Sequence, residues 1–143
     1  MQPTKKLKLE ELGRIDVETF KKTEKIPLMV ILDNVRSMHN VGAAFRTADA
    51  FLVEKIILCG ITPKPPHREI HKAALGATES VDWQFYENVK EAVIDLKTLG
   101  HEVVGIEQTT NSVMITDFNI DRTKKYALVL GNEVEGISDE ILS

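Results

Sequence analysis

The 143-residue chain has few of the features that assign a protein to a class at once. Its only cysteine is Cys59, which excludes an intrachain disulfide and a cysteine-based metal cluster. No uninterrupted apolar stretch approaches the roughly 18 residues that a membrane helix needs, and the polar, basic start lacks the apolar core of a signal peptide. We therefore expect a cytoplasmic protein without a membrane partner, in which Cys59 is a buried and inert thiol.

The chain also lacks an excess of positive charge, with 18 lysines and arginines against 22 carboxylates. The formal net charge of −4 argues against a protein that holds nucleic acid mainly through an excess of basic residues. The charge is unevenly spread, however, because residues 1–25 carry a net charge of +2 and the remainder carries −6. This distribution indicates a basic N-terminal arm or helix over residues 1–26, followed by a single domain over residues 27–143. A solvated helix of mixed charge explains the first 25 residues equally well.

From residue 28 onward, short apolar runs alternate with stretches of helical periodicity. Period and composition predict strands at 28–32, 55–59, 81–86, 102–106 and 126–130. Helices are predicted after Asn40, around 67–75, after Asn88 and after Ser138. Trp83 and Phe85 alternate with polar neighbours, which is typical of side chains that point into the core.

This order of elements favours an α/β fold with a mostly parallel, Rossmann-like sheet and helices on both faces. Ligands of such sheets bind beyond the carboxyl ends of the strands. The loops that follow Leu32, Ile106 and Leu130 are therefore where a functional site is expected.

The loop after the first strand opens a helix directly, between Asp33 and Ala48. Asn40 stands where an N-cap is expected, and the free amides of a helix start can hold an anion. Arg46 lies further along that helix, off its apolar face, and can point back toward the loop. The alternative is that Asn40 only caps the helix and that Arg46 is only solvated.

The loop after the last strand reads Leu130-Gly131-Asn132-Glu133-Val134-Glu135-Gly136. Two glycines around polar residues allow the backbone to approach a planar ligand such as adenine. A glycine turn needs no ligand, so this loop is informative mainly in combination with the first.

The two loops together resemble the SpoU (TrmH-like) class of the SPOUT superfamily of RNA 2′-O-ribose methyltransferases. Asn40-x-Gly42-Ala43-x-x-Arg46-Thr47-Ala48 is similar to the first motif of that family, and the segment from Leu130 to Gly136 is similar to its second. Ile106-Glu107-Gln108 stands where the family has a further strand end that contacts the cofactor. The resemblance covers residues 27–143.

The resemblance implies an enzyme that transfers a methyl group from S-adenosyl-L-methionine to a ribose 2′-hydroxyl of tRNA or rRNA. It also implies a homodimer and an α/β knot threaded by the C-terminal segment. The catalytic residues that it implies are Arg46, Asn40 and Glu133. The cofactor-binding residues that it implies are Ile106, Glu107, Gln108, Leu130, Gly131, Asn132 and Gly136. No metal is expected, since His67 and His71 are four residues apart without a third ligand.

The chain departs from the family pattern at its end. The family's third motif, a loop and helix bearing serine and asparagine, has no counterpart before Ser143. We therefore expect a methyltransferase domain truncated before that motif, without the knot-forming segment and with weakened cofactor binding. One alternative is a noncatalytic RNA-binding or dimerisation module of the same fold. Another is an unrelated flavodoxin-like nucleotide binder, which the absence of a glycine-rich phosphate loop after the first strand disfavours.

Overall fold

The computed structural model describes residues 3–143 and has a five-stranded sheet at its centre. The strands lie in the order β3-β2-β1-β5-β4, and all four neighbouring pairs are parallel. Their bounds are β1 Ile26–Asp33, β2 Val53–Cys59, β3 Trp83–Tyr86, β4 His101–Ile106 and β5 Lys125–Leu130. All five predicted strands are present, and the predicted α/β fold with a parallel sheet is confirmed.

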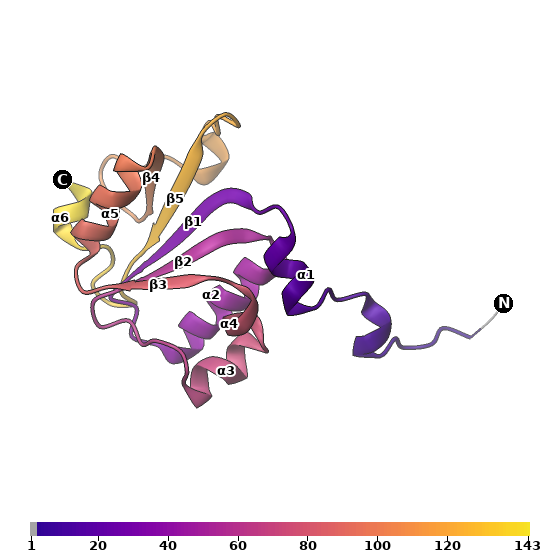
Figure 1. The fold of residues 1–143 in the computed structure, drawn as a ribbon. Coiled ribbons are helices and arrows are strands. Elements are labelled where there is room, and N and C mark those ends of the chain that lie inside the picture. Colours follow the sequence, from indigo (N-terminus) through magenta and orange to yellow (C-terminus); the bar gives the residue numbers. More distant parts are fainter. Residues whose placement is uncertain (1–2) are drawn as a thin grey trace.

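Helices cover both faces of this sheet (Figure 1). Helices α2, α3 and α4 lie on one face with α1 at its margin, and α5 and α6 lie on the other. The α-helices are α1 Val17–Lys22, α2 Met38–Ala50, α3 Arg68–Ala74, α4 Ala77–Ser80, α5 Val89–Thr98 and α6 Asp139–Leu142. Two 3₁₀ turns, η1 Leu9–Leu12 and η2 Ile115–Asp117, complete the described elements.

The uninterrupted apolar run at 28–32 lies in β1, which has a core on each of its two faces. Leu32 faces the core formed with α2 and α3, while Met29 and Ile31 face the core formed with α5. Successive side chains of a strand point to opposite faces, so a strand covered by helices on both sides buries nearly every residue. Cys59 at the end of β2 is also fully buried, and desolvation raises the pKa of its thiol to about 12. The expectation that Cys59 is buried is confirmed, and the raised pKa disfavours the thiolate form that reacts.

The order of the strands places a switch in chain direction beside β1. The chain moves outward from β1 to β2 and β3, then crosses to the far edge at β4 and returns through β5 to pair with β1. Such a switch point opens a crevice at the carboxyl ends of the central strands, where doubly wound sheets bind ligands. In this chain the loop after β5, the strand next to β1, lines a pocket together with the loop after β4.

The start of α2 differs from the sequence prediction. Ser37 is the N-cap, and its hydroxyl accepts a 3.1 Å hydrogen bond from the N–H of Asn40. The prediction that Asn40 caps this helix is therefore wrong, because the helix begins at Met38 and Asn40 lies within its first turn. Asn88 caps α5 as predicted, by accepting from the N–H of Lys90 at 2.7 Å. Ser138 precedes α6, but its side chain makes no capping bond.

The N-terminal residues divide into a projecting part and a packed part. Residues 3–13 extend away from the body (Figure 1), and Arg14 then binds the Asp49 carboxylate at 3.3 Å and the Leu75 carbonyl at 3.2 Å. Phe20 of α1 is only 2% exposed and belongs to the core shared with α2. Helix α1 thus packs with the body, and the projecting arm ends near Arg14. None of the helices within residues 3–143 has the length and apolar composition needed to cross a membrane.

Candidate cofactor pocket and adjoining helix start

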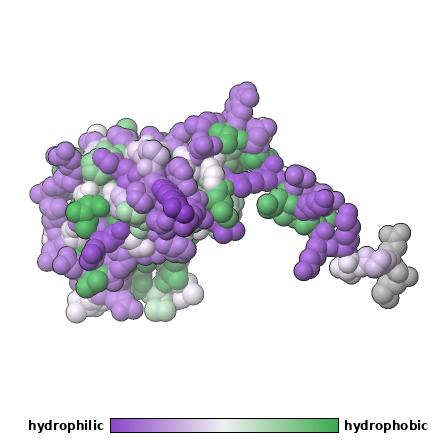
Figure 2. Space-filling model, turned by 90° about the horizontal axis from the view of Figure 1, so that it is seen from below, coloured by the Kyte–Doolittle hydropathy of each residue, from purple (hydrophilic) through white to green (hydrophobic). Residues whose placement is uncertain are grey.

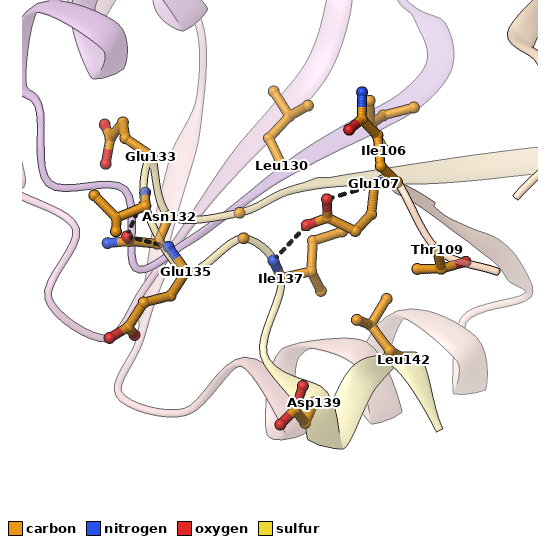
Figure 3. A pocket seen from close by; sticks show the side chains of 14 residues that line it. Ile106, Glu107, Thr109, Leu130, Asn132, Glu133, Glu135, Ile137, Asp139 and Leu142 are labelled. Atoms are coloured by element: carbon orange, nitrogen blue, oxygen red, sulfur yellow. Dashed lines mark hydrogen bonds between the residues drawn. The ribbon is translucent and has the colours of Figure 1, made fainter.

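A pocket of about 520 Å³ lies at the carboxyl ends of β4 and β5 and is closed on one side by α6. Figure 3 shows its lining, which comes from segments separated by more than twenty residues of chain. All seven residues predicted to bind the cofactor line it: Ile106, Glu107, Gln108, Leu130, Gly131, Asn132 and Gly136. The remaining lining residues are Thr109, Glu133, Val134, Glu135, Ile137, Asp139 and Leu142.

The loop after β5 is a closed turn whose shape depends on its glycines. Asn132 and Gly136 exchange backbone hydrogen bonds of 2.9 Å in each direction. The side-chain oxygen of Asn132 also accepts from the N–H groups of Val134 and Glu135, at 2.9 and 3.0 Å. A Cβ atom on Gly131 would collide with the backbone of Gly136 and Ile137, so this turn needs glycine there.

Glu107 links the end of β4 to this turn. Its carboxylate accepts hydrogen bonds from the N–H of Gln108 at 2.8 Å and from the N–H of Ile137 at 3.0 Å (Figure 3). These two bonds hold the pKa of Glu107 below its ordinary value, so the carboxylate stays charged at neutral pH. The two walls of the pocket are therefore connected by one side chain.

Glu133 connects the same turn to the start of α2. Its carboxylate accepts from the N–H of Arg36 at 2.9 Å, from the N–H of Ser37 at 3.0 Å and from the side-chain amide of Asn40 at 3.0 Å. Desolvation alone would raise its pKa, but these hydrogen bonds outweigh that effect and lower the pKa from 4.5 to about 2. A carboxylate at the N-terminus of a helix is also favoured by the helix dipole.

Of the three residues predicted to be catalytic, the structure joins two and leaves the third separate. The side chain of Asn40 bonds Glu133 rather than Arg46. Arg46 is exposed on α2, and its side chain makes no hydrogen bond or ion pair with any part of residues 3–143. Its guanidinium is therefore available to a partner outside the chain.

Three residues that the sequence analysis passed over hold the loops together. Asp33, only 1% exposed, accepts from the N–H of Ser138 at 2.8 Å and from its hydroxyl at 3.1 Å. Asn34 accepts from the N–H of Ile61 through its side chain and from the Asn132 amide through its carbonyl, at 3.0 and 2.7 Å. The Thr62 hydroxyl accepts from the N–H of Val35 at 3.1 Å. The sequence signal that could have identified them is the polar pair Asp33-Asn34 at the end of a buried apolar run. Polar groups that are buried there need hydrogen-bond partners.

The chain also has a larger, mainly apolar depression of about 1150 Å³ beside β4 and β5, under the segment from 107 to 124. That segment exposes several large apolar side chains: Val113, Met114, Ile115 and Ile120. His67, considered above as a possible metal ligand, instead accepts from the N–H of Glu69 and caps α3. Across the described residues, no three side chains of His, Cys, Asp or Glu gather as a metal site requires.

A parallel sheet with helices on both faces and a pocket at the carboxyl ends of β4 and β5 is typical of α/β proteins that bind a small ligand at that edge of the sheet. The chain belongs to the SpoU rRNA Methylase family, whose model matches residues 27–143. The resemblance drawn from the two motifs is thereby confirmed.

Curated relatives include two whose names specify an RNA. The chain is 31% identical over 111 residues to the 23S rRNA (guanosine-2′-O-)-methyltransferase RlmB of Neisseria meningitidis, a match that covers 78% of this chain and 43% of the relative. It is 34% identical over 131 residues to the tRNA (guanosine(18)-2′-O)-methyltransferase of Aquifex aeolicus, covering 87% of this chain and 57% of the relative. The chain thus spans about half the length of the curated relatives it matches.

Solved structures agree with the fold. An rRNA methyltransferase from Sinorhizobium meliloti, in its AdoMet-bound form, superposes with a TM-score of 0.75 at 27% identity, covering 86% of this chain and 47% of that chain. A TrmH/SpoU tRNA modifying enzyme from A. aeolicus superposes with a TM-score of 0.72 at 28% identity, covering 88% of this chain and 62% of that chain.

Proposed function

We propose that this chain is the cofactor-binding part of an RNA methyltransferase that transfers a methyl group from S-adenosyl-L-methionine to a ribose 2′-hydroxyl of tRNA or rRNA. The observation that carries the proposal is the single pocket lined by all seven predicted cofactor residues and tied through Glu133 to the helix that bears Arg46. The names of the rRNA and tRNA methyltransferases that the chain resembles support it.

The chemistry of the pocket fits a cationic cofactor better than a phosphate-bearing one. Its lining includes four carboxylates, Glu107, Glu133, Glu135 and Asp139, and neither lysine nor arginine. Such a site favours the sulfonium and ammonium charges of S-adenosylmethionine and repels the phosphates of a nucleotide. This contrast disfavours the flavodoxin-like nucleotide binder considered above.

The size and apolar walls of the pocket support the same cofactor. A volume of about 520 Å³ lies within the usual range for small-molecule sites. Ile106, Leu130 and Leu142 supply apolar surface against which a flat ring can pack. Glu107 and Glu135 are the carboxylates placed to accept from hydroxyl and amino groups of the cofactor.

The bound cofactor supplies a methyl group on a positively charged sulfur, which is ready for displacement by a nucleophile. The task of the protein is then to bring a ribose hydroxyl into line with that methyl group. A guanidinium is a donor of hydrogen bonds and not an acceptor, so the role of Arg46 is to bind a phosphate of the target RNA and orient the hydroxyl. Glu133 and Asn40 are positioning residues, because they hold the start of α2 against the pocket loop.

The proposal includes a homodimer in the cytoplasm, as the family resemblance implies. The mass of the protein in solution, measured by light scattering after size-exclusion chromatography, tests the dimer directly. A monomer at all concentrations would remove this part of the proposal and leave the reaction itself standing.

The reaction is tested by two measurements on the full-length protein. Calorimetric titration with S-adenosylhomocysteine should show binding at one site per chain. Tritiated methyl groups should then pass from S-adenosylmethionine to an unmodified tRNA or rRNA transcript and produce a phosphodiester resistant to alkali, since a 2′-O-methyl group blocks cleavage there. Binding without transfer would favour the noncatalytic module, and no binding would refute both readings.

A further inference from the structure

The charges of the chain separate along its length. Residues 34–76 carry six lysines and arginines against three carboxylates, together with three of the four histidines. Residues 77–143 carry five lysines and arginines against thirteen carboxylates. The first segment supplies α2 and α3 on one side of the sheet, and the second supplies the short α4 on that same side and α5 and α6 on the other (Figure 1). We call the side that carries α2 and α3 the basic side and the side that carries α5 and α6 the acidic side.

Most of the cations on the basic side have no carboxylate partner. Within the described residues, Lys72 is the single member of the six that forms an ion pair, with Glu69 at 3.3 Å. Four of the others are exposed: Arg36, Arg46, Lys64 and Arg68. An exposed cation without a partner can exchange its counterion for a phosphate at little cost in desolvation.

We name these four residues the basic strip. Arg36 and Lys64 lie in loops at the same edge of the sheet as the pocket, Arg68 begins α3, and Arg46 lies on α2. Arg36 follows β1, and Lys64 follows β2. The two loops are bonded to each other, since Asn34 accepts from Ile61 at 3.0 Å and Thr62 accepts from Val35 at 3.1 Å. The loops that carry Arg36 and Lys64 are thus joined by hydrogen bonds between side chains and backbone N–H groups.

The same loops are bonded to the pocket turn. Glu133 accepts from the N–H of Arg36, and Asn132 donates to the carbonyl of Asn34. Lys64 is fixed in a further way, because its ammonium lies 4.1 Å from the centre of the Phe85 ring, within cation–π range. Arg68 is the first residue of α3, directly after this loop. The spacing between pocket and strip is therefore a fixed property of the fold.

The pocket and the strip differ in charge. Figure 2, a view from below in the frame of Figure 1, shows a surface that is mainly hydrophilic with separate apolar areas. The pocket itself carries four carboxylates and no base, so it repels a phosphate chain. Glu69, the acidic residue next to Arg68, is occupied by Lys72.

We propose that the basic strip Arg36, Arg46, Lys64 and Arg68 binds the phosphate backbone of the RNA and presents one ribose to the neighbouring pocket. This inference rests on the proposed function and adds the path of the RNA: along α2 and the start of α3, and away from α5 and α6. Phosphate contacts fix position and register without reading sequence. The strip therefore serves affinity and placement, and recognition of a particular nucleotide lies elsewhere.

The test compares two charge-reversed pairs in the full-length protein. The strip pair is Lys64→Glu with Arg68→Glu. The control pair is Lys90→Glu with Lys97→Glu, two exposed lysines of α5 on the acidic side that take part in no ion pair within residues 3–143. The probe is a fluorescein-labelled, unmodified tRNA transcript, and its dissociation constant is measured by anisotropy over a series of salt concentrations. Thermal unfolding and titration with S-adenosylhomocysteine accompany each variant.

The strip pair should weaken RNA binding about tenfold or more near 0.1 M salt and reduce the slope of log affinity against log salt by about 1.4 to 1.8, the value for two lost phosphate contacts. The control pair has the same change in net charge and should alter the slope by less than about 0.4, half the value for one phosphate contact. Cofactor affinity should stay within about twofold in both pairs. Lys64 packs on Phe85, so the double variant can fail to fold. In that case the single variants Lys64→Gln and Arg68→Glu replace it, and each should reduce the slope by about 0.7 to 0.9.

Equal losses of RNA affinity from the two pairs would overturn the inference, because only the overall charge would then matter. An unchanged RNA affinity of the strip pair would also overturn it, because the strip would then not contact the RNA. Failure of the unmodified protein to bind RNA and S-adenosylhomocysteine would overturn the proposed function itself. The two failures are therefore distinguished by the same set of titrations.

Discussion

The side-chain amide of Asn40 donates a 3.0 Å hydrogen bond to Glu133 Oε1 and joins α2 to the loop after β5 across 93 residues of sequence. Glu133 receives two further bonds from the backbone of Arg36 and Ser37, so donors from the start of one helix satisfy both of its oxygens. The negative charge also lies at the positive end of the helix dipole. This arrangement couples the position of Arg46 to the shape of the candidate cofactor pocket.

Replacing Glu133 with glutamine should weaken this coupling, because an NH₂ group would then face backbone donors. We expect the free energy of unfolding at pH 7 to fall by roughly 1 kcal/mol, a value reduced by the exposure of the side chain. The pKa of Glu133 falls from 4.5 to about 2 on folding, so its stabilisation is complete above pH 4.5 and is lost as the pH falls through about 2. Urea unfolding of both proteins from pH 7 to pH 2 should show this difference shrink, and a difference independent of pH would contradict it.

Ser37→Ala should lower the stability of the protein by about 1 kcal/mol through the lost N-cap of α2. Asn40→Ala keeps that cap and removes one bond to Glu133, so its effect on methyl transfer should exceed its effect on stability. Urea midpoints at unchanged m-value give the stabilities, and kcat/KM gives the activity. A larger loss of stability from Asn40→Ala than from Ser37→Ala would show that the bond to Glu133, not the cap, stabilises the helix start.

Arg46→Ala should abolish methyl transfer while leaving the fold and the affinity for S-adenosylhomocysteine nearly unchanged. The reason is that the side chain of Arg46 is exposed and makes no hydrogen bond or ion pair within residues 3–143, so its removal disturbs no packing. Thermal unfolding, cofactor titration and transfer assays on one preparation decide the matter. Arg46→Lys is the matched control and should recover little activity, because a lysine cannot bind a phosphate through two parallel N–H groups. A collapse of the thermal transition would instead mark Arg46 as structural.

Gly131→Ala should destroy the candidate pocket, since the new Cβ atom would collide with the backbone of Gly136 and Ile137. We expect a loss of about 1–3 kcal/mol in stability and no measurable binding of S-adenosylhomocysteine. Gly105→Ala on β4 is the control, because its Cβ would meet only the end of the Ile137 side chain, at 3.0 Å. Cofactor binding that survives Gly131→Ala would place the cofactor outside this turn.

Deleting residues 1–13 should weaken RNA binding without changing cofactor affinity. The slope of log affinity against log salt should fall by about 0.7 to 0.9, the value for one phosphate contact. The motivation is the basic N-terminal segment, of which residues 3–13 project from the body (Figure 1). A longer deletion through residue 25 would remove Phe20 from the core and confuse the result, as loss of a buried phenylalanine costs about 3–5 kcal/mol. Anisotropy titrations with the labelled tRNA transcript give both quantities, and an unchanged salt slope would exclude the arm from RNA binding.

The sequence alone determined the elements and the places where the chain could act. Continuous apolar runs and one alternating stretch identified the five strands, and a period of 3.6 residues identified the main helices, because burial on one face or on both imposes those patterns. The capping of α5 by Asn88 was predictable for a similar reason, since a cap is a contact between residues a few positions apart. The polar and glycine-containing loops directly after apolar strands indicated both motifs.

Only the tertiary structure decided which of those loops meet and which side chains bind one another. The crossing from β3 to β4 and back to β5 brings Glu107 beside Ile137 and closes the pocket, and strand order is not encoded in any local period. Ser37 and Asn40 are both good caps by residue type, and Asn40 lies inside the helix, where its amide bonds a carboxylate 93 residues away. Local patterns fix energies between near neighbours, whereas contacts between distant residues gain their energy only after the chain has folded them together.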